Sequence, residues 1–260
     1  LYYGEEYIKR TTLTNDALKA LGSEQLIAAV QELMGKQHEA LYYGPKSEEE
    51  VKQLIAENHK AADELAPLEK NYPKKQLTDQ SSVILAQYDA NQLYYLQFSN
   101  RGEQFDVKND PAITLYNEYF GGSMNSICFQ EMREARGLAY TAQAWLASPS
   151  FADDSYSYTA FIATQNDKMQ TAIEAFDEII NQMPESEAAF QIAKEAIISR
   201  LRTARTTGTG VLNSYIQLRR LGLSEDRDRQ IFEQVQTMTL DDVKATQQQW
   251  VKDRSYTYGI

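Results

Sequence analysis

The sequence contains very little cysteine and histidine. Among its 260 residues there are one cysteine, Cys128, and two histidines, His38 and His59. A single cysteine excludes a disulfide within the chain, so cysteine usage leaves the redox compartment open. Neither "HEALYY" nor "HKAADE", the stretches that begin at the two histidines, contains a second histidine. We therefore predict no zinc site in this chain, and we expect both histidines to be solvated or bonded locally.

Positive charge and long apolar runs are also scarce. The chain has 26 Lys and Arg against 37 Asp and Glu, a formal net charge of −11. Binding to nucleic-acid phosphates requires a cationic surface, so we expect no nucleic-acid partner. The basic cluster "SRLRTART" at residues 199–206 is interpreted as a solvated helix face. No apolar run approaches the roughly 18 residues that a membrane span requires, so none is expected.

The remaining composition is that of a globular protein, with 42% hydrophobic and 24% charged residues. The chain begins with Leu1 rather than Met, and we interpret it as a fragment or a mature piece. No secretory signal is visible in the sequence. A periplasmic or cell-envelope location is our expectation for the compartment, although no retained signal argues for it.

The first 60 residues predict a small helix–strand–helix unit. Apolar residues recur at helical spacing over 23–34, "HEALYYG" at 38–44 is typical of a strand, and Ser47 with Glu50 forms a capping box for a second helix. Such a unit cannot bury a core of its own, so we expect it to pack on something else. A charged, proline-containing segment, 62–75, is interpreted as a connection.

From residue 82 onward, strands come first and helices collect later. "SSVILAQYD" and "NQLYYLQFS" predict a hairpin, helices are expected over 110–120 and 125–135, and strands over 138–148 and 155–165. Helices then follow from residue 167 to a final strand in "SYTYGI". This order predicts an α+β fold, a two-layer sandwich of a mainly antiparallel sheet with helices on one face. The strand at 155–165 is a candidate edge for binding an extended peptide.

A weak internal similarity links the two ends of the chain. "SEQLIAAVQELMGKQHEALYYG" and "TLDDVKATQQQWVKDRSYTYG" both predict a capped helix followed by a strand that ends in Tyr-Gly. In this alignment Leu26 corresponds to Val243 and Leu33 to Trp250. The similarity suggests that residues 1–60 are the tail of one unit and that the remainder is a complete second copy.

The stretch "GGSMNSICFQEMREARGLAY" at 121–140 places Arg133 and Tyr140 on either side of a turn at Gly137. Taken alone, Arg133 is interpreted as a surface helix arginine and Tyr140 as a core tyrosine of a strand. Cys128 is expected to be a small buried residue, because no base is indicated near it. The "TTGTG" at 206–210 lacks the lysine of a phosphate-binding loop and is interpreted as an interhelical turn.

"YNEYFGGSMNSICFQEMREARGLAY" resembles the insulinase/pitrilysin family of zinc metallopeptidases, which includes the mitochondrial processing peptidases. Members of that family have a Gly-Gly break followed by Arg-Glu-x-Arg-Gly-Leu-Ala-Tyr, and "REARGLAY" matches it. The resemblance implies a complete C-terminal peptidase-family domain over 61–260. It also implies that residues 1–60 are the tail of a preceding family domain and the start of a linker.

The family implies two halves around a closed chamber, one of which holds zinc on His-x-x-Glu-His. Because this chain lacks that motif, it resembles the C-terminal, non-zinc-binding half. The resemblance implies no catalytic or metal residue in this chain, with Arg133 and Tyr140 as substrate-binding groups. Zinc is expected in the N-terminal catalytic half, on the same polypeptide or on a partner subunit. Peptide is the expected substrate, and this chain alone is expected to be inactive.

Two alternatives stay open from the sequence. One is a non-catalytic scaffold or partner subunit of a related peptidase complex. The other is an unrelated peptide-binding α+β module that imitates the motif. A search of the gene upstream of Leu1, or of its neighbour, for His-x-x-Glu-His discriminates the peptidase from the scaffold.

Overall fold

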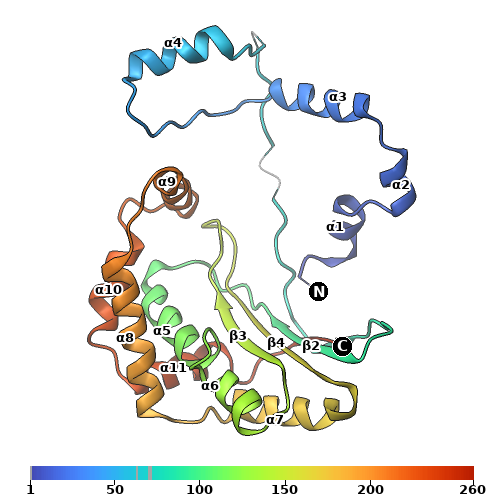
Figure 1. Cartoon of the computed structure of the whole chain (residues 1–260), viewed down its shortest axis with the longest axis vertical. Coiled ribbons are helices and arrows are strands. Elements are labelled where there is room, and N and C mark those ends of the chain that lie inside the picture. Colours follow the sequence, from blue (N-terminus) through green and yellow to red (C-terminus); the bar gives the residue numbers. More distant parts are fainter. Residues whose placement is uncertain (1, 63, 70–71) are drawn as a thin grey trace. The chain divides into compact units, whose positions relative to one another are not determined.

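The computed structural model describes residues 2–62, 64–69 and 72–260 (Figure 1). Contacts divide the chain into two units. The sandwich unit comprises Tyr2, Lys75–Arg205 and Gln217–Ile260, and the helical unit comprises Tyr3–Lys74 and Thr206–Ile216. The predicted domain boundary after residue 60 stays a prediction. No helix in the described part of the chain is long and apolar enough to cross a membrane.

The sandwich unit is built on a five-stranded sheet with the order β1-β5-β2-β4-β3. The strands are β1 (Ser82–Ile84), β2 (Gln92–Ser99), β3 (Thr141–Ala147), β4 (Ser157–Gln165) and β5 (Thr257–Gly259). β1 pairs with β5 in parallel, and the other pairs are antiparallel. The predicted α+β fold with a mainly antiparallel sheet is therefore confirmed.

Helices of the sandwich unit lie against one face of this sheet (Figure 1). They are η1 (Val107–Asn109), α5 (Asp110–Phe120), α6 (Ile127–Phe129), η2 (Gln130–Ala135), η3 (Asn166–Lys168), α7 (Met169–Asn181), α8 (Glu187–Thr203), α10 (Arg227–Val235) and α11 (Leu240–Trp250). α9 (Thr209–Leu221) belongs partly to each unit. α5 and α6 contact β3, and α7 contacts β4.

Side chains that alternate along the strands form the core beneath the helices. Ala144 of β3 lies opposite Ala160 of β4, and both are fully buried. Tyr158 and Ile162, two residues away on either side along β4, are buried as well. Since successive strand residues point to opposite faces, this register turns one face of each strand toward the helices.

The predicted hairpin of β1 and β2 is wrong. Both strands form, but β5 lies between them and pairs with each. The turn residues around Asp89–Asn91 therefore reverse the chain without pairing its two arms. Sequence adjacency favoured the hairpin, whereas the final strand, far away in sequence, lies between its two arms.

The strand suggested as a peptide-binding edge is not an edge. β4 is paired on one side with β2 and on the other with β3, so its backbone groups are already engaged. At the β3 border, Asn117 of α5 covers part of the strand: its Oδ1 accepts from Leu146 N at 2.8 Å and its Nδ2 donates to Leu146 O at 2.9 Å. A Cβ at Gly121 would meet Ala144 O at 2.2 Å, so α5 ends directly against the β3 backbone.

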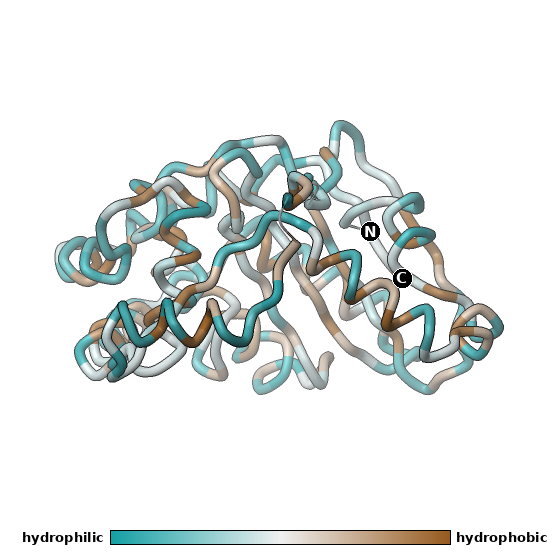
Figure 2. Tube along the Cα trace, turned by 90° about the horizontal axis from the view of Figure 1, so that it is seen from above, coloured by the Kyte–Doolittle hydropathy of each residue, from teal (hydrophilic) through white to brown (hydrophobic). Residues whose placement is uncertain are grey.

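The helical unit contains four short helices with no buried residue: α1 (Gly4–Thr11), α2 (Asn15–Ala20), α3 (Ser23–Met34) and α4 (Glu48–Asn58). Apolar residues recur along α3 and α4 between polar ones (Figure 2). The capping box of α4 is confirmed, since Ser47 N donates to Glu50 and Glu50 N donates to Ser47. The strand predicted at 38–44 is wrong: these residues form no ladder with the described chain, and a strand requires a paired neighbour.

A buried ion pair joins the segment between α11 and β5 to the loop after β2. The Arg254 side chain is fully buried, and its Nη2 donates to both carboxylate oxygens of Glu103 at 2.7 and 2.8 Å. Burial lowers the pKa of Arg254, while the charge of Glu103 opposes that shift. Glu103 also accepts from Arg101 Nε at 2.8 Å.

We expect Glu103→Gln to lower the free energy of unfolding by about 2 to 3 kcal/mol, because it leaves a buried cation without its counter-charge. Glu233→Gln is the matched control: Glu233 pairs with Arg229 on an exposed helix face, where such pairs contribute about 0.5 kcal/mol or less. Urea titration of both variants measures the difference. Equal losses of unfolding free energy from the two substitutions would show that the buried ion pair contributes no more than the exposed one.

A second polar cluster lies between β2 and α7. Gln97 is buried, and its Nε2 donates to Asp177 Oδ1 at 2.6 Å. The hydroxyl of Tyr95 donates to the same oxygen at 3.4 Å. Burial raises the pKa of Asp177, and the hydrogen bonds from Gln97 and Tyr95 oppose the rise only in part.

The raised pKa of Asp177 makes its contribution to stability depend on pH. With a raised pKa, the Asp177 carboxyl holds its proton more tightly in the folded state than in the unfolded chain. Its contribution to the free energy of unfolding is therefore fully present at low pH and is lost as pH rises through the folded pKa. Asp177→Asn is expected to be more stable than the wild type at pH 8, with the gain disappearing toward pH 4. Urea titrations at the two pH values test this, and a gain that grows at low pH would contradict it.

Candidate functional site

The segment from Ser126 to Gly137 forms two consecutive kinds of helix. α6 is a single α-helical turn, and the chain continues without a break into η2, which is a π-helix. Arg136 N donates to Glu131 O at 3.2 Å, the i to i−5 bond of that geometry. The helix predicted over 125–135 is therefore present, but its second half is wider than an α-helix. Such π segments occur frequently at functional sites.

Gly137 reverses the chain from η2 into β3. Its φ of +59° lies in the left-handed region, which favours glycine, and a Cβ there would meet nothing within 4 Å. Neighbouring elements hold the turn on both sides. Thr164 Oγ1 of β4 donates to Leu138 O at 2.6 Å, and Lys168 Nζ donates to Gly137 O at 3.1 Å.

Arg136, the residue before the turn, binds carboxylates of its own domain. Its Nη1 donates to Glu178 Oε2 of α7 at 2.8 Å, and its Nε lies 3.6 Å from Glu131. The hydrogen bond to Glu178 is the main cause that raises the pKa of Arg136. This guanidinium therefore fastens η2 to α7, which is a structural role.

The turn brings Arg133 and Tyr140 into contact. Arg133 Cζ lies 5.1 Å from the centre of the Tyr140 ring, and its Nη1 donates to Tyr140 O at 3.3 Å. Both side chains face solvent: Arg133 is 43% exposed and Tyr140 is 68% exposed. The alternative in which Tyr140 is a core tyrosine is therefore wrong. The assignment of both residues as substrate-binding stays a prediction.

A third side chain, which the motif does not single out, takes part in this contact. Phe129 also contacts the Arg133 guanidinium, with its ring centre likewise 5.1 Å from Cζ. The signal that was available is its position four residues before Arg133 on one helical segment. The group has the chemistry of a donor site, because guanidinium and phenol hydrogens can stabilise an oxygen that carries negative charge.

Cys128 and the two histidines do not form a nucleophilic or metal centre. Cys128 is completely buried, and burial raises the pKa of its thiol, which opposes formation of a thiolate. His38 Nε2 and His59 Nε2 are 2.6 Å apart, a hydrogen-bond distance, whereas two nitrogens on one tetrahedral zinc are separated by about 3.3 Å. No group of three or more His, Cys, Asp or Glu in the described residues is arranged to hold a metal. The residues present do not fit zinc.

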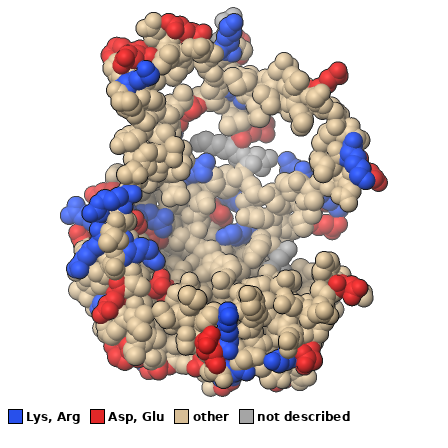
Figure 3. All heavy atoms as spheres, in the orientation of Figure 1, with Lys and Arg blue, Asp and Glu red and all other residues tan. Residues whose placement is uncertain are grey.

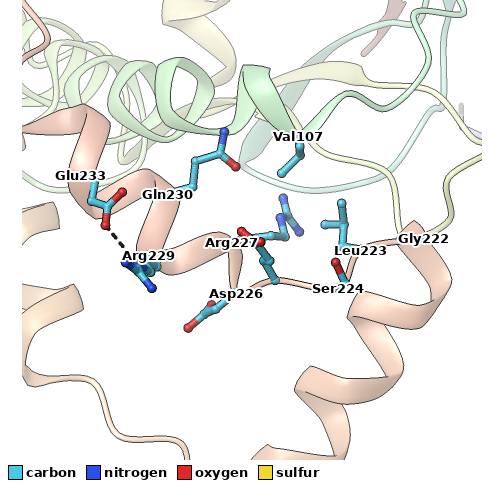
Figure 4. Close-up of a pocket in the computed structure, with 10 residues that line it drawn as sticks. Val107, Gly222, Leu223, Ser224, Asp226, Arg227, Arg229, Gln230 and Glu233 are labelled. Carbon is cyan, nitrogen blue, oxygen red and sulfur yellow. Dashed lines mark hydrogen bonds and ion pairs between the residues drawn. The ribbon is translucent and has the colours of Figure 1, made fainter.

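A pocket of about 550 Å³ lies elsewhere, between η1 and the loop that joins α9 to α10 (Figure 4). Both of its arginines are already paired: Arg227 Nε contacts the buried Asp110 at 2.6 Å, and Arg229 contacts Glu233. Basic residues gather over α8–α10 (Figure 3), among them Arg200, which contacts Glu118. We assign no chemistry to this pocket or to this cluster.

Comparison with known proteins agrees with these features. Residues 24–197, more than half of the chain, match the family model described as the peptidase M16 inactive domain. The chain belongs to the peptidase M16 family. It corresponds to the inactive domain of these proteins, and the matched region includes the whole Gly-Gly to Tyr140 segment and the Arg136 contacts. No curated protein matches the sequence.

Solved structures resemble this M16 domain in fold. A peptidase M16 inactive domain from Pseudomonas fluorescens superposes with a TM-score of 0.65 at 16% identity, covering 94% of this chain and 58% of that one. A conserved protein from Enterococcus faecalis gives 0.69 at 14% identity, covering 95% and 57%. The periplasmic protease PqqL from Escherichia coli gives 0.57 at 14% identity, covering 83% and 24%. The chain thus spans less than two thirds of the length of each of these structures.

The left-handed turn at Gly137 gives a direct test of the site's architecture. We expect Gly137→Ala to lower the free energy of unfolding by about 1 kcal/mol, because alanine is strained at positive φ. Gly137→Asn is the matched control, since asparagine tolerates this region better and should cost less. Urea titration compares the two. A destabilisation by asparagine as large as that by alanine would show that strain at φ is not the cause.

Proposed function

We propose that this inactive M16 domain presents Arg133 and Tyr140 to a peptide substrate that is hydrolysed by another half of the enzyme. The observation that carries the proposal is the contact of the two side chains on a hydrogen-bonded turn that faces solvent. Because the described residues hold no group of metal ligands, zinc is expected in the N-terminal catalytic half, on the same polypeptide or a partner subunit. This chain alone is expected to be inactive.

The proposed role follows from the charge that develops during amide hydrolysis. Attack of water on the amide carbon forms a tetrahedral intermediate, in which the former carbonyl oxygen carries a negative charge. An Arg guanidinium and a Tyr hydroxyl donate more strongly to that oxygen than to the neutral carbonyl, so they lower the barrier instead of only binding the substrate. Both side chains carry donor hydrogens, and no proton transfer by this chain is required.

The sheet face opposite the helices supports a role in enclosing peptide. Tyr94 of β2 and Phe161 of β4 stack there at 5.6 Å between ring centres. Tyr94 is about half exposed, and Trp145 of β3 is partly exposed on the same face. Aromatic surface of this kind suits contact with the side chains of an extended peptide. We propose that this face forms part of the wall of the peptide chamber.

The helical unit supports the proposal that residues 1–60 complete a preceding family domain. In the internal alignment, Val243 and Trp250 of α11 are buried against the sandwich core, whereas the corresponding Leu26 and Leu33 of α3 are 58% and 63% exposed. The two helices share a pattern, but only α11 is followed by a paired strand, β5. We infer that α3 covers the sheet of another domain in the complete protein.

A non-catalytic scaffold or partner subunit is the second candidate function. The family model that matches describes an inactive domain, which is compatible with an assembly that has lost its metal-binding half. A periplasmic or cell-envelope location also remains a prediction. Peptide cleavage by the complete gene product, with and without a metal chelator, decides between the peptidase and the scaffold. Cleavage that the chelator abolishes supports the peptidase, and no cleavage of any tested peptide supports the scaffold.

In the complete enzyme, Tyr140→Phe is expected to lower kcat by about a hundredfold or more, because it removes one donor to the tetrahedral oxygen. Tyr88→Phe is the matched control, as it removes a hydroxyl from another highly exposed tyrosine and should leave turnover unchanged. Steady-state kinetics with one peptide measure both. Near-normal turnover of Tyr140→Phe would defeat the proposed role.

A further inference from the structure

The guanidinium of Arg133 contacts two aromatic rings. Phe129 and Tyr140 each place a ring centre 5.1 Å from Arg133 Cζ. The two rings differ in their surroundings, since Phe129 is half-buried and Tyr140 is 68% exposed. One ring therefore belongs to the packed domain, and the other is available at its surface.

Phe129 is fixed by the element that carries it. It is the last residue of α6, directly after Ile127 and Cys128, which are both buried in the core. The chain then enters the π-helix η2, which carries Arg133 on its next turn. An arginine side chain has about 2 kcal/mol of rotamer entropy, so a guanidinium aimed from a helix surface needs a contact that restricts it. The face of a fixed ring supplies this contact through its quadrupole.

We propose that Phe129 is a positioning residue that holds the Arg133 guanidinium in the direction required by the substrate oxygen. Tyr140 contacts the same guanidinium, but its ring is exposed, so Phe129 is the contact that stays with Arg133 when the phenol moves toward substrate. This inference rests on the proposed function, because it assigns Phe129 an effect on catalysis that acts only through Arg133. Phe129 itself does not touch the reacting atoms.

The test uses the complete gene product and one peptide substrate. Phe129→Leu keeps an apolar side chain but removes the aromatic face, and Phe129→Tyr keeps the face. Contacts of this kind at exposed sites correspond to about a two- to fivefold effect. We expect Phe129→Leu to lower kcat by that factor with KM within twofold, and Phe129→Tyr to restore kcat. Equal kcat for Phe129→Leu and the wild type would overturn the inference.

A double-mutant cycle separates positioning from general structural damage. In an Arg133→Met background, Phe129→Leu is expected to have no further effect, because the group through which it acts is gone. If the two losses simply multiply, Phe129 acts independently of Arg133 and the inference is overturned. Urea titration of Phe129→Leu establishes that the variant is folded under the conditions of the assay.

A readout without turnover distinguishes failure of the inference from failure of the proposed function. In the complete protein labelled with isotopic arginine, the Phe129 ring should contribute to an upfield shift of the Arg133 side-chain proton resonances, and Phe129→Leu should reduce that shift while Phe129→Tyr keeps it. An unshifted resonance in the wild type overturns the positioning role. A shifted resonance together with normal turnover of Arg133→Met overturns the proposed function, and with it the catalytic consequence of Phe129.

Discussion

The geometry of the candidate site depends on how the turn at Gly137 is held between β4 and α7. Thr164 and Lys168 each donate to a carbonyl of the turn, and Arg136 reaches Glu178 on α7. These bonds come from elements that are themselves fixed by the buried core. The exposed side chains of Arg133 and Tyr140 can therefore stay in contact, because the backbone that carries them is held in one conformation.

The local elements of the sandwich unit could be predicted from the sequence because they depend on short-range signals. Pro111 at the start of α5, the glycines at its end and the alternation in β3 act within a few residues. Strand order could not be obtained in this way. Placing β5 between β1 and β2 depends on contacts across most of the chain, and turn chemistry at Asp89–Asn91 carries no information about them.

The site shows the same division between local and long-range information. Arg133 and Tyr140 could be selected from the motif, and the left-handed glycine between them predicts that the chain reverses there. The π-helical geometry could not be foreseen, since an inserted residue in a helix leaves no periodic signature over one turn. The contact between Phe129 and Arg133 was indicated only by their four-residue spacing. The strand prediction for residues 38–44 was wrong for another reason. Their composition is typical of a strand, but a strand forms only where a neighbouring strand pairs with it.

The side-chain amide of Asn117 closes part of one border of the sheet by imitating a neighbouring strand at Leu146. The opposite border, β1, has exposed Val83 and Ile84 and carries no charged residue to repel a foreign strand. Its short length is the protection that remains. Self-association of this domain at high concentration, or during its synthesis, would therefore begin at β1, well separated along the chain from the residues assigned to substrate.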